Sequence, residues 1–211
     1  IPMKDYWSMN FRGTHYLRVD DLSIGEVKAV LELARRLKIE YHAGIPHPIL
    51  RDKVLAMLFE KPSTRTRVSF ESGMAQLGGH PMYLSFDTMQ IKRGETIADT
   101  ARIISSYSDI ICARLYKQTT REEIAKYSRV PVINALTDVE HPCQALADIM
   151  TIQEHIGFDG KTVAYVGDAA NNVAHSLMIA CAKVGLNYRA VCPKGYEPKE
   201  WAIKTFEKNA A

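Results

Sequence analysis

Five consecutive residues, Ser63 to Arg67, bring two arginines and three hydroxyl side chains together directly after a proline. The apolar run 53–59 before them predicts a buried strand, and residues 68–78 after them predict a helix. Ser63 is then the expected N-cap, and the first turn of a helix attracts phosphate through unpaired N–H groups and a partial positive charge. Arg65 and Arg67 would add charged forks that can bind phosphate oxygens through paired hydrogen bonds. The corner therefore indicates an anion site, to which the hydroxyls add donors.

The same residues also have an ordinary structural interpretation. Ser63 would simply cap a helix, while Arg65 and Arg67 would be solvated or paired with Glu60 and Glu71. The corner by itself leaves both interpretations open.

His141 and Gln144 form a second candidate cluster, three residues apart at the start of another predicted helix. They follow a predicted parallel strand, as the corner does, so both clusters are expected at the same edge of the sheet, where α/β proteins bind ligands. A histidine can donate to a developing oxyanion, and a glutamine can both donate and accept. The alternative is a turn histidine that satisfies backbone groups.

The elements that must position these residues alternate along the chain. Strands are predicted over residues 53–59, 78–86, 109–116, 129–136, 162–167 and 187–192. Helices are predicted over residues 24–37 (after a capping Ser23), 68–78, 95–108, 120–128, 141–157 and 171–185. Strands that are apolar along their length, separated by helices, indicate α/β architecture with a parallel sheet covered on both faces. We place a domain boundary near residue 151, giving domains 1–150 and 151–211.

Composition excludes several classes of protein. The 211 residues carry 27 basic and 24 acidic side chains with no polybasic tail, which favours a small anionic ligand over nucleic acid or a membrane surface. No apolar run approaches a membrane span, and the first residues lack the layout of a secretory signal. The cysteines, expected to be reduced and mostly buried, have no metal-ligand spacing; they are Cys112, Cys143, Cys181 and Cys192. A cytoplasmic protein without a metal is expected.

Several long motifs, in order along the whole chain, resemble the aspartate and ornithine carbamoyltransferase family. "FEKPSTRTR" and "HPCQALAD" are similar to the family's carbamoyl-phosphate signature pair. "MQIKRGETIADTAR", "HPCQALADIMTIQEH", and "GDAANNVAHSLM" followed by "PKGYEP" resemble the ornithine branch. The resemblance implies transfer of the carbamoyl group of carbamoyl phosphate to the side-chain amine of L-ornithine, with citrulline and phosphate as products.

The resemblance also implies a role for each matching residue. The binders of carbamoyl phosphate would be Ser63, Thr64, Arg65, Thr66, Gln90, Arg114, His141 and Gln144, with Arg67 in support. Among them Arg65, Arg114 and His141 would be catalytic, and Gln90 would reach the site of a neighbouring subunit. Asn172 would contact ornithine. Taken singly, Arg114 could be a strand-end arginine in a salt bridge, and Asn172 a helix cap.

No metal, nicotinamide or other cofactor is implied, and the resemblance implies homotrimers or multiples of trimers. Family members continue beyond Ala211 with an aspartate, a Ser-Met-Gly loop and a His-Cys-Leu-Pro segment, none of which occurs here. The second domain is therefore expected to be incomplete. The acceptor could also be putrescine, acetylornithine or, less readily, aspartate, and a non-catalytic homologue that binds carbamoyl phosphate stays open.

A nucleotide-binding enzyme is the remaining rival. Residues 163–176 read as strand, turn and helix, but the turn has Gly167 without G-x-G-x-x-G spacing. The pattern therefore gives no support to an NAD-dependent dehydrogenase.

Overall fold

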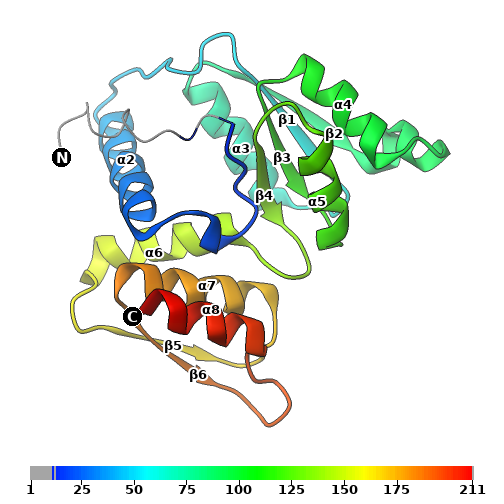
Figure 1. Ribbon diagram of the computed structural model, residues 1–211. Coiled ribbons are helices and arrows are strands. Elements are labelled where there is room, and N and C mark those ends of the chain that lie inside the picture. The colour runs from blue at the N-terminus through cyan, green and yellow to red at the C-terminus, as the bar shows by residue number, and fades with distance from the viewer. Residues whose placement is uncertain (1–10, 12, 211) are drawn as a thin grey trace. The chain divides into compact units, whose positions relative to one another are not determined.

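A computed structural model describes residue 11 and residues 13–210 of the chain (Figure 1). The described residues divide into two compact units. The N-terminal unit comprises residues 11, 13–17 and 36–137, and the C-terminal unit comprises residues 18–35 and 138–210. Helix α2 (Ile24–His42) runs through the division at residue 35. The domain boundary expected at residue 151 stays a prediction.

A parallel four-stranded sheet forms the centre of the N-terminal unit. Its strands are β1 (Val54–Phe59), β2 (His80–Ser85), β3 (Ile110–Arg114) and β4 (Val132–Leu136), in the spatial order β2-β1-β3-β4. Each of the four runs predicted from the sequence contains one of these strands. Because the strands are parallel, their carboxyl ends lie along one edge of the sheet.

Helices pack on both faces of this sheet, as expected for α/β architecture. Figure 1 shows α3 (Thr64–Gln76), α4 (Ile97–Tyr107) and α5 (Gln118–Tyr127) around the strands. On one face, Ala56 and Leu58 of β1 share a core with Ile104 of α4 and Ile124 of α5. The other face has a separate core that includes Met74 of α3; its strand residues are Leu55, Met57, Phe59, Cys112 and Ala135.

Short 3-10 helices and side-chain caps shape the connections. After β2 the chain forms η2 (Phe86–Thr88) and η3 (Gln90–Arg93), two short helices that the sequence patterns do not predict. Thr96 caps α4 by accepting a 3.0 Å hydrogen bond from the N–H of Asp99. The predicted cap at Ser23 is also confirmed, since its hydroxyl accepts from the N–H of Glu26 at 3.3 Å.

The C-terminal unit has a smaller parallel sheet of two strands. In chain order it contains η1 (Val19–Asp21), α6 (Pro142–Ile156), β5 (Thr162–Val166), α7 (Asn172–Val184), β6 (Asn187–Val191) and α8 (Glu200–Ala210). Strands β5 and β6 pair with each other, and α7 is buried from Ala174 to Val184. Alternate residues of both strands are exposed, including Val166 at 76%. The sheet is therefore covered on one face by described residues, consistent with the expected incomplete second domain.

Candidate functional site

The predicted corner is a capped helix N-terminus at the carboxyl end of β1. The Ser63 hydroxyl accepts a 3.3 Å hydrogen bond from the N–H of Thr66 and donates to the Thr66 hydroxyl at 3.0 Å. Thr64 and Arg65 are then the first two residues of α3, where N–H groups have no partner within the helix. The N-cap prediction is confirmed, and the turn offers backbone and hydroxyl donors side by side.

Arg114 is brought to this corner by strand pairing. It is the last residue of β3 and lies in register with Phe59, the last residue of β1. Its carbonyl accepts from the N–H groups of Glu60 at 3.0 Å and Lys61 at 3.3 Å, which holds the chain leaving β1 against β3. A register shift at Ala113 and Arg114 interrupts the pairing with β4, and such irregularities re-aim a side chain. The guanidinium Nη1 donates to the Thr66 hydroxyl at 3.2 Å.

Arg114 is a buried cation without a negatively charged partner among the described residues. Arg114 is only 9% exposed, and its Nε is buried without a hydrogen-bond partner. No carboxylate of the described residues forms an ion pair with its guanidinium. Burial lowers the pKa of Arg114; Cys112 opposes this shift, and the charge of Arg65 adds to it. A buried guanidinium beside a second one is costly without a counter-charge. A small dianion would supply that charge.

The two arginines of the corner differ in their partners. Arg67 donates to Glu71 at 2.9 Å, and its guanidinium lies 3.8 Å from the centre of the Tyr83 ring. Arg65 is exposed and makes no ion pair with the described residues. Glu60 accepts instead from the N–H of Tyr116 at 2.9 Å. The ordinary structural interpretation therefore describes Arg67, whereas Arg65 keeps its charge available for a ligand.

Gln90 is not joined to the corner by any contact that we find. It is the exposed first residue of η3, in the connection that follows β2, and its side chain makes no hydrogen bond with the described part of the chain. Its predicted role toward a neighbouring subunit stays a prediction.

His141 lies in the C-terminal unit and is fixed through its backbone. It occupies the N-cap position of α6, with Pro142 as the first helical residue, and is 9% exposed. Its N–H donates a 2.8 Å hydrogen bond to the hydroxyl of Ser176, which is fully buried in α7. Sequence reasoning did not single out Ser176. Its spacing of four residues from Asn172 on one helix is the signal that could have drawn attention to it.

Gln144 lies in the first turn of α6, where its side chain is exposed. Its Nε2 donates to the carboxylate of Asp148, one turn further along, at 2.9 Å.

Asn172 is the first residue of α7, and its neighbour Asn171 is the cap. The Asn171 side chain accepts from the N–H groups of Val173 at 2.9 Å and Ala174 at 3.0 Å. The capping alternative thus applies to Asn171. Because Asn172 and Ser176 both belong to α7, one helix carries the predicted ornithine contact and the hydroxyl that holds His141.

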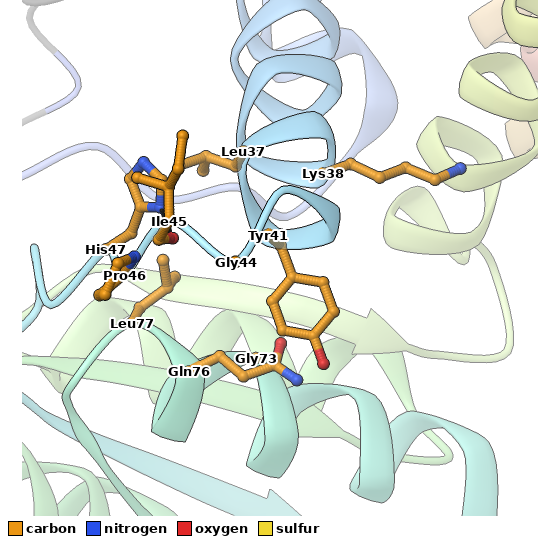
Figure 2. A pocket seen from close by; sticks show the side chains of 10 residues that line it. All are labelled: Leu37, Lys38, Tyr41, Gly44, Ile45, Pro46, His47, Gly73, Gln76 and Leu77. Carbon is orange, nitrogen blue, oxygen red and sulfur yellow. Dashed lines mark hydrogen bonds between the residues drawn. The ribbon is translucent and has the colours of Figure 1, made fainter.

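A well-formed cavity in the N-terminal unit lies elsewhere. It has a volume of about 510 Å³, and Figure 2 shows its lining: the end of α2, the loop after it, and α3. The lining residues are Leu37, Lys38, Tyr41, Gly44, Ile45, Pro46, His47, Gly73, Gln76 and Leu77. None of the predicted site residues is among them, so this cavity is separate from the corner.

The described residues show neither a metal-binding cluster nor a membrane-spanning helix. They contain no cluster of three or more His, Cys, Asp or Glu side chains suited to a metal ion, and none of their helices is long and apolar enough to cross a membrane. The four cysteines are free; Cys112 and Cys181 are buried, while Cys143 and Cys192 are partly buried.

The fold is α/β, and hydrogen-bond donors and arginines gather at the carboxyl edge of its parallel sheet. Comparison with family models is more specific. Residues 14–154 match the carbamoyl-P binding domain of aspartate/ornithine carbamoyltransferase, and residues 159–211 match the Asp/Orn binding domain of the same family. The chain belongs to the aspartate/ornithine carbamoyltransferase family.

Individual relatives agree with this assignment. The chain is 54% identical over 204 residues to an ornithine carbamoyltransferase of Pyrococcus abyssi, covering 96% of this chain and 64% of that one. A solved structure of the Pyrococcus furiosus ornithine carbamoyltransferase matches with a TM-score of 0.91 and 54% identity, over 95% of this chain and 64% of that one. A solved structure of a mitochondrial ornithine carbamoyltransferase of Coccidioides immitis matches with a TM-score of 0.87 and 38% identity. The match covers 93% of this chain and 65% of that one. The chain thus spans slightly less than two thirds of the length of these relatives.

Proposed function

We propose that this chain takes part in ornithine carbamoyl transfer, in which the carbamoyl group of carbamoyl phosphate moves to the side-chain amine of L-ornithine. The products would be citrulline and phosphate. Support comes from family membership and from relatives named ornithine carbamoyltransferase at about 50% identity. The single observation that carries the proposal is Arg114, a buried cation without a counter-charge whose guanidinium contacts the first turn of α3.

The phosphate would be held by the α3 N-terminus with the side chains of Ser63, Thr64, Arg65 and Thr66. As the bond between the carbonyl carbon and the phosphate oxygen breaks, negative charge grows on the departing phosphate. Arg65 and Arg114 would stabilise that charge, because preorganised cations need no rearrangement at the moment of reaction. Arg67, already paired with Glu71, would support the corner rather than bind directly.

The carbonyl oxygen would receive hydrogen bonds from Thr66, Arg114 and His141 as the tetrahedral intermediate forms. Gln144 would accept a hydrogen bond from the carbamoyl NH₂ group. The nucleophile is the neutral amine of ornithine, which forms the new N–C bond and gives up a proton that the leaving phosphate could accept. Asn172 would contact the amino-acid substrate.

Assembly and location form part of the proposal. Homotrimers, in which Gln90 reaches a neighbouring site, and a cytoplasmic location are the arrangements that family membership suggests. Residues 1–150 would bind carbamoyl phosphate, and residues 151–211 would begin the ornithine-binding domain.

A second candidate is kept because the chain covers 64% of its Pyrococcus relatives: carbamoyl-phosphate binding without turnover. The test supplies the purified 211-residue chain with carbamoyl phosphate and ornithine, measures citrulline, and measures carbamoyl-phosphate binding by calorimetry. Citrulline formation establishes the proposed function. Binding without citrulline favours the second candidate or another amine, which putrescine and acetylornithine as acceptors would separate. Absence of binding overturns both candidates.

A further inference from the structure

Asp148 lies one turn after Gln144 on α6, and its carboxylate has few polar partners. It is partly buried, and the 2.9 Å bond from Nε2 of Gln144 is its only hydrogen bond with the described residues. No lysine, arginine or histidine among the described residues forms an ion pair with Asp148. An isolated, partly buried carboxylate costs free energy, and a neutral residue at this helix position would avoid that cost.

The electrostatic surroundings of Asp148 agree with this description. Partial burial raises the pKa of Asp148, and the hydrogen bond from Gln144 opposes the rise because it stabilises the charged form. On the neighbouring helix α7, burial raises the pKa of Cys181 to about 12, and the nearby charge of Asp148 adds to that shift. The one group that the carboxylate contacts through a hydrogen bond among the described residues is the amide of Gln144 on its own helix.

An ionised carboxylate can only accept hydrogen bonds, so it determines which end of the Gln144 amide turns toward it. The NH₂ end must face Asp148. The Oε1 end accepts no hydrogen bond from the described residues and is left for a ligand. A glutamine that presents only its carbonyl oxygen favours a ligand with an N–H donor and gains nothing from a methyl group at the same place.

We propose that Asp148 is a positioning residue that fixes the Gln144 amide with its oxygen toward the ligand, and so selects a carbamoyl group over an acyl group of the same shape. The inference rests on the proposed function, because it takes Gln144 as the residue that meets the carbamoyl NH₂. An asparagine at position 148 could pair with either end of the amide, so the orientation would no longer be fixed.

The test compares two stable ligands that differ only at this position. Phosphonoacetamide carries a carboxamide NH₂, acetonylphosphonate carries a methyl group instead, and a CH₂ bridge keeps both from decomposing. Calorimetry gives the ratio of their dissociation constants for the wild-type chain, and we expect a preference of about tenfold for phosphonoacetamide. Asp148→Asn should reduce the preference to about threefold or less while inorganic phosphate binds as before.

A double-mutant cycle separates positioning from a general structural effect. Gln144→Ala should remove the preference, and adding Asp148→Asn to it should change the ratio no further, because Asp148 acts through Gln144. The matched control is Glu122→Gln on α5, where Gln118 donates to Glu122 at 2.8 Å with the same spacing along a helix; it should keep the wild-type ratio.

The possible results separate a failure of the proposed role of Asp148 from a failure of the proposed function. If the wild type binds both phosphonates and Asp148→Asn keeps the tenfold preference, the inference is wrong and the proposed function is untouched. A further loss of preference in the double variant would also contradict it. If the wild type binds neither phosphonate nor carbamoyl phosphate, the proposed function fails and the inference falls with it.

Discussion

The guanidinium of Arg114 donates from Nη1 to the hydroxyl of Thr66 at 3.2 Å, which joins the last residue of β3 to the first turn of α3. The two residues are 48 positions apart in the chain. Their contact gathers a buried cation, a hydroxyl and a helix N-terminus at one place. Each of these groups attracts an anion, which is why we propose the corner as the phosphate-binding site.

Removing the guanidinium of Arg65 or of Arg114 should strongly weaken carbamoyl-phosphate binding. We expect Arg65→Ala and Arg114→Ala to weaken carbamoyl-phosphate binding by about 100-fold or more, because each removes a charge-assisted contact to the ligand. Calorimetry measures the affinity, and circular dichroism checks that the fold is retained. Arg102→Ala is the control, since Arg102 pairs with Asp99 at 2.8 Å on α4. Unchanged affinity in both site variants would contradict the assignment.

Ser176 should matter for the placement of His141. In Ser176→Ala the buried N–H of His141 loses its 2.8 Å acceptor, at a cost of about 1–3 kcal/mol in the free energy of unfolding. We expect carbamoyl-phosphate affinity to fall several-fold as well, because the segment before α6 is no longer held.

Ser105→Ala is the matched control for this experiment. Ser105 is also buried, at 4% exposure, but its hydroxyl only donates to the carbonyl of Arg102 on its own helix at 3.1 Å. Urea denaturation and calorimetry on both variants make the comparison. Equal effects of the two substitutions would show that the hydroxyl of Ser176 has no special role.

His175 should make stability depend on pH. Burial lowers its pKa, and the charge of Lys199 lowers it further, while a hydrogen bond with the backbone of Val139 and the charge of Asp168 oppose the shift. Its Nε2 accepts from the N–H of Lys199 at 3.2 Å, so the neutral ring fits the fold.

The sign of this dependence follows from the lowered pKa. Below about pH 6.5 the unfolded chain takes up a proton that the folded chain resists, so stability falls as pH drops, by at most about 1.4 kcal/mol per pH unit. It levels off once the pH is below the pKa of the folded state. Urea midpoints between pH 7.5 and pH 4.5 measure the trend, and His175→Gln should flatten it. A variant with the wild-type slope would assign the dependence to other groups.

Lys183 should be essential for the stability of the C-terminal unit. It is 3% exposed, and its Nζ donates to the carbonyl of Leu22 at 2.7 Å and to Asn209 at 2.9 Å, and lies 3.0 Å from Asp20. Lys183→Met leaves these acceptors without their cation, and we expect a loss of about 3–5 kcal/mol in the free energy of unfolding.

The control for Lys183 is a lysine in an exposed pair. Lys204 contacts Glu200 at 2.6 Å with both side chains at least 70% exposed, so Lys204→Met should cost less than about 1 kcal/mol. Urea denaturation of the two variants tests the difference. A small loss in both would show that the buried contacts of Lys183 contribute little.

Local sequence determined much of this protein. Ser63 caps α3 because a hydroxyl before a helical run satisfies an N–H group two or three residues later, which is a property of neighbouring residues. The strands were equally readable, because a short apolar run between turn signals suits a buried parallel strand. Helix α8 was not predicted from the sequence. The 3-10 helices η2 and η3 could not be predicted either, because three or four residues are too few to show a periodic pattern.

Tertiary structure decided which side chains meet. The chain order of the strands does not reveal that β1 lies between β2 and β3, and only that pairing brings Arg114 to Thr66. Whether Arg65 or Arg67 is available to a ligand depended on Glu71 and the Tyr83 ring. The bond from His141 to Ser176 likewise needed α6 and α7 to pack. The sequence by itself determined the capped helix, the apolar strands and the residue types of the site, because these depend on near neighbours. Burial and partners depend on contacts between distant segments, so only the folded chain could decide them.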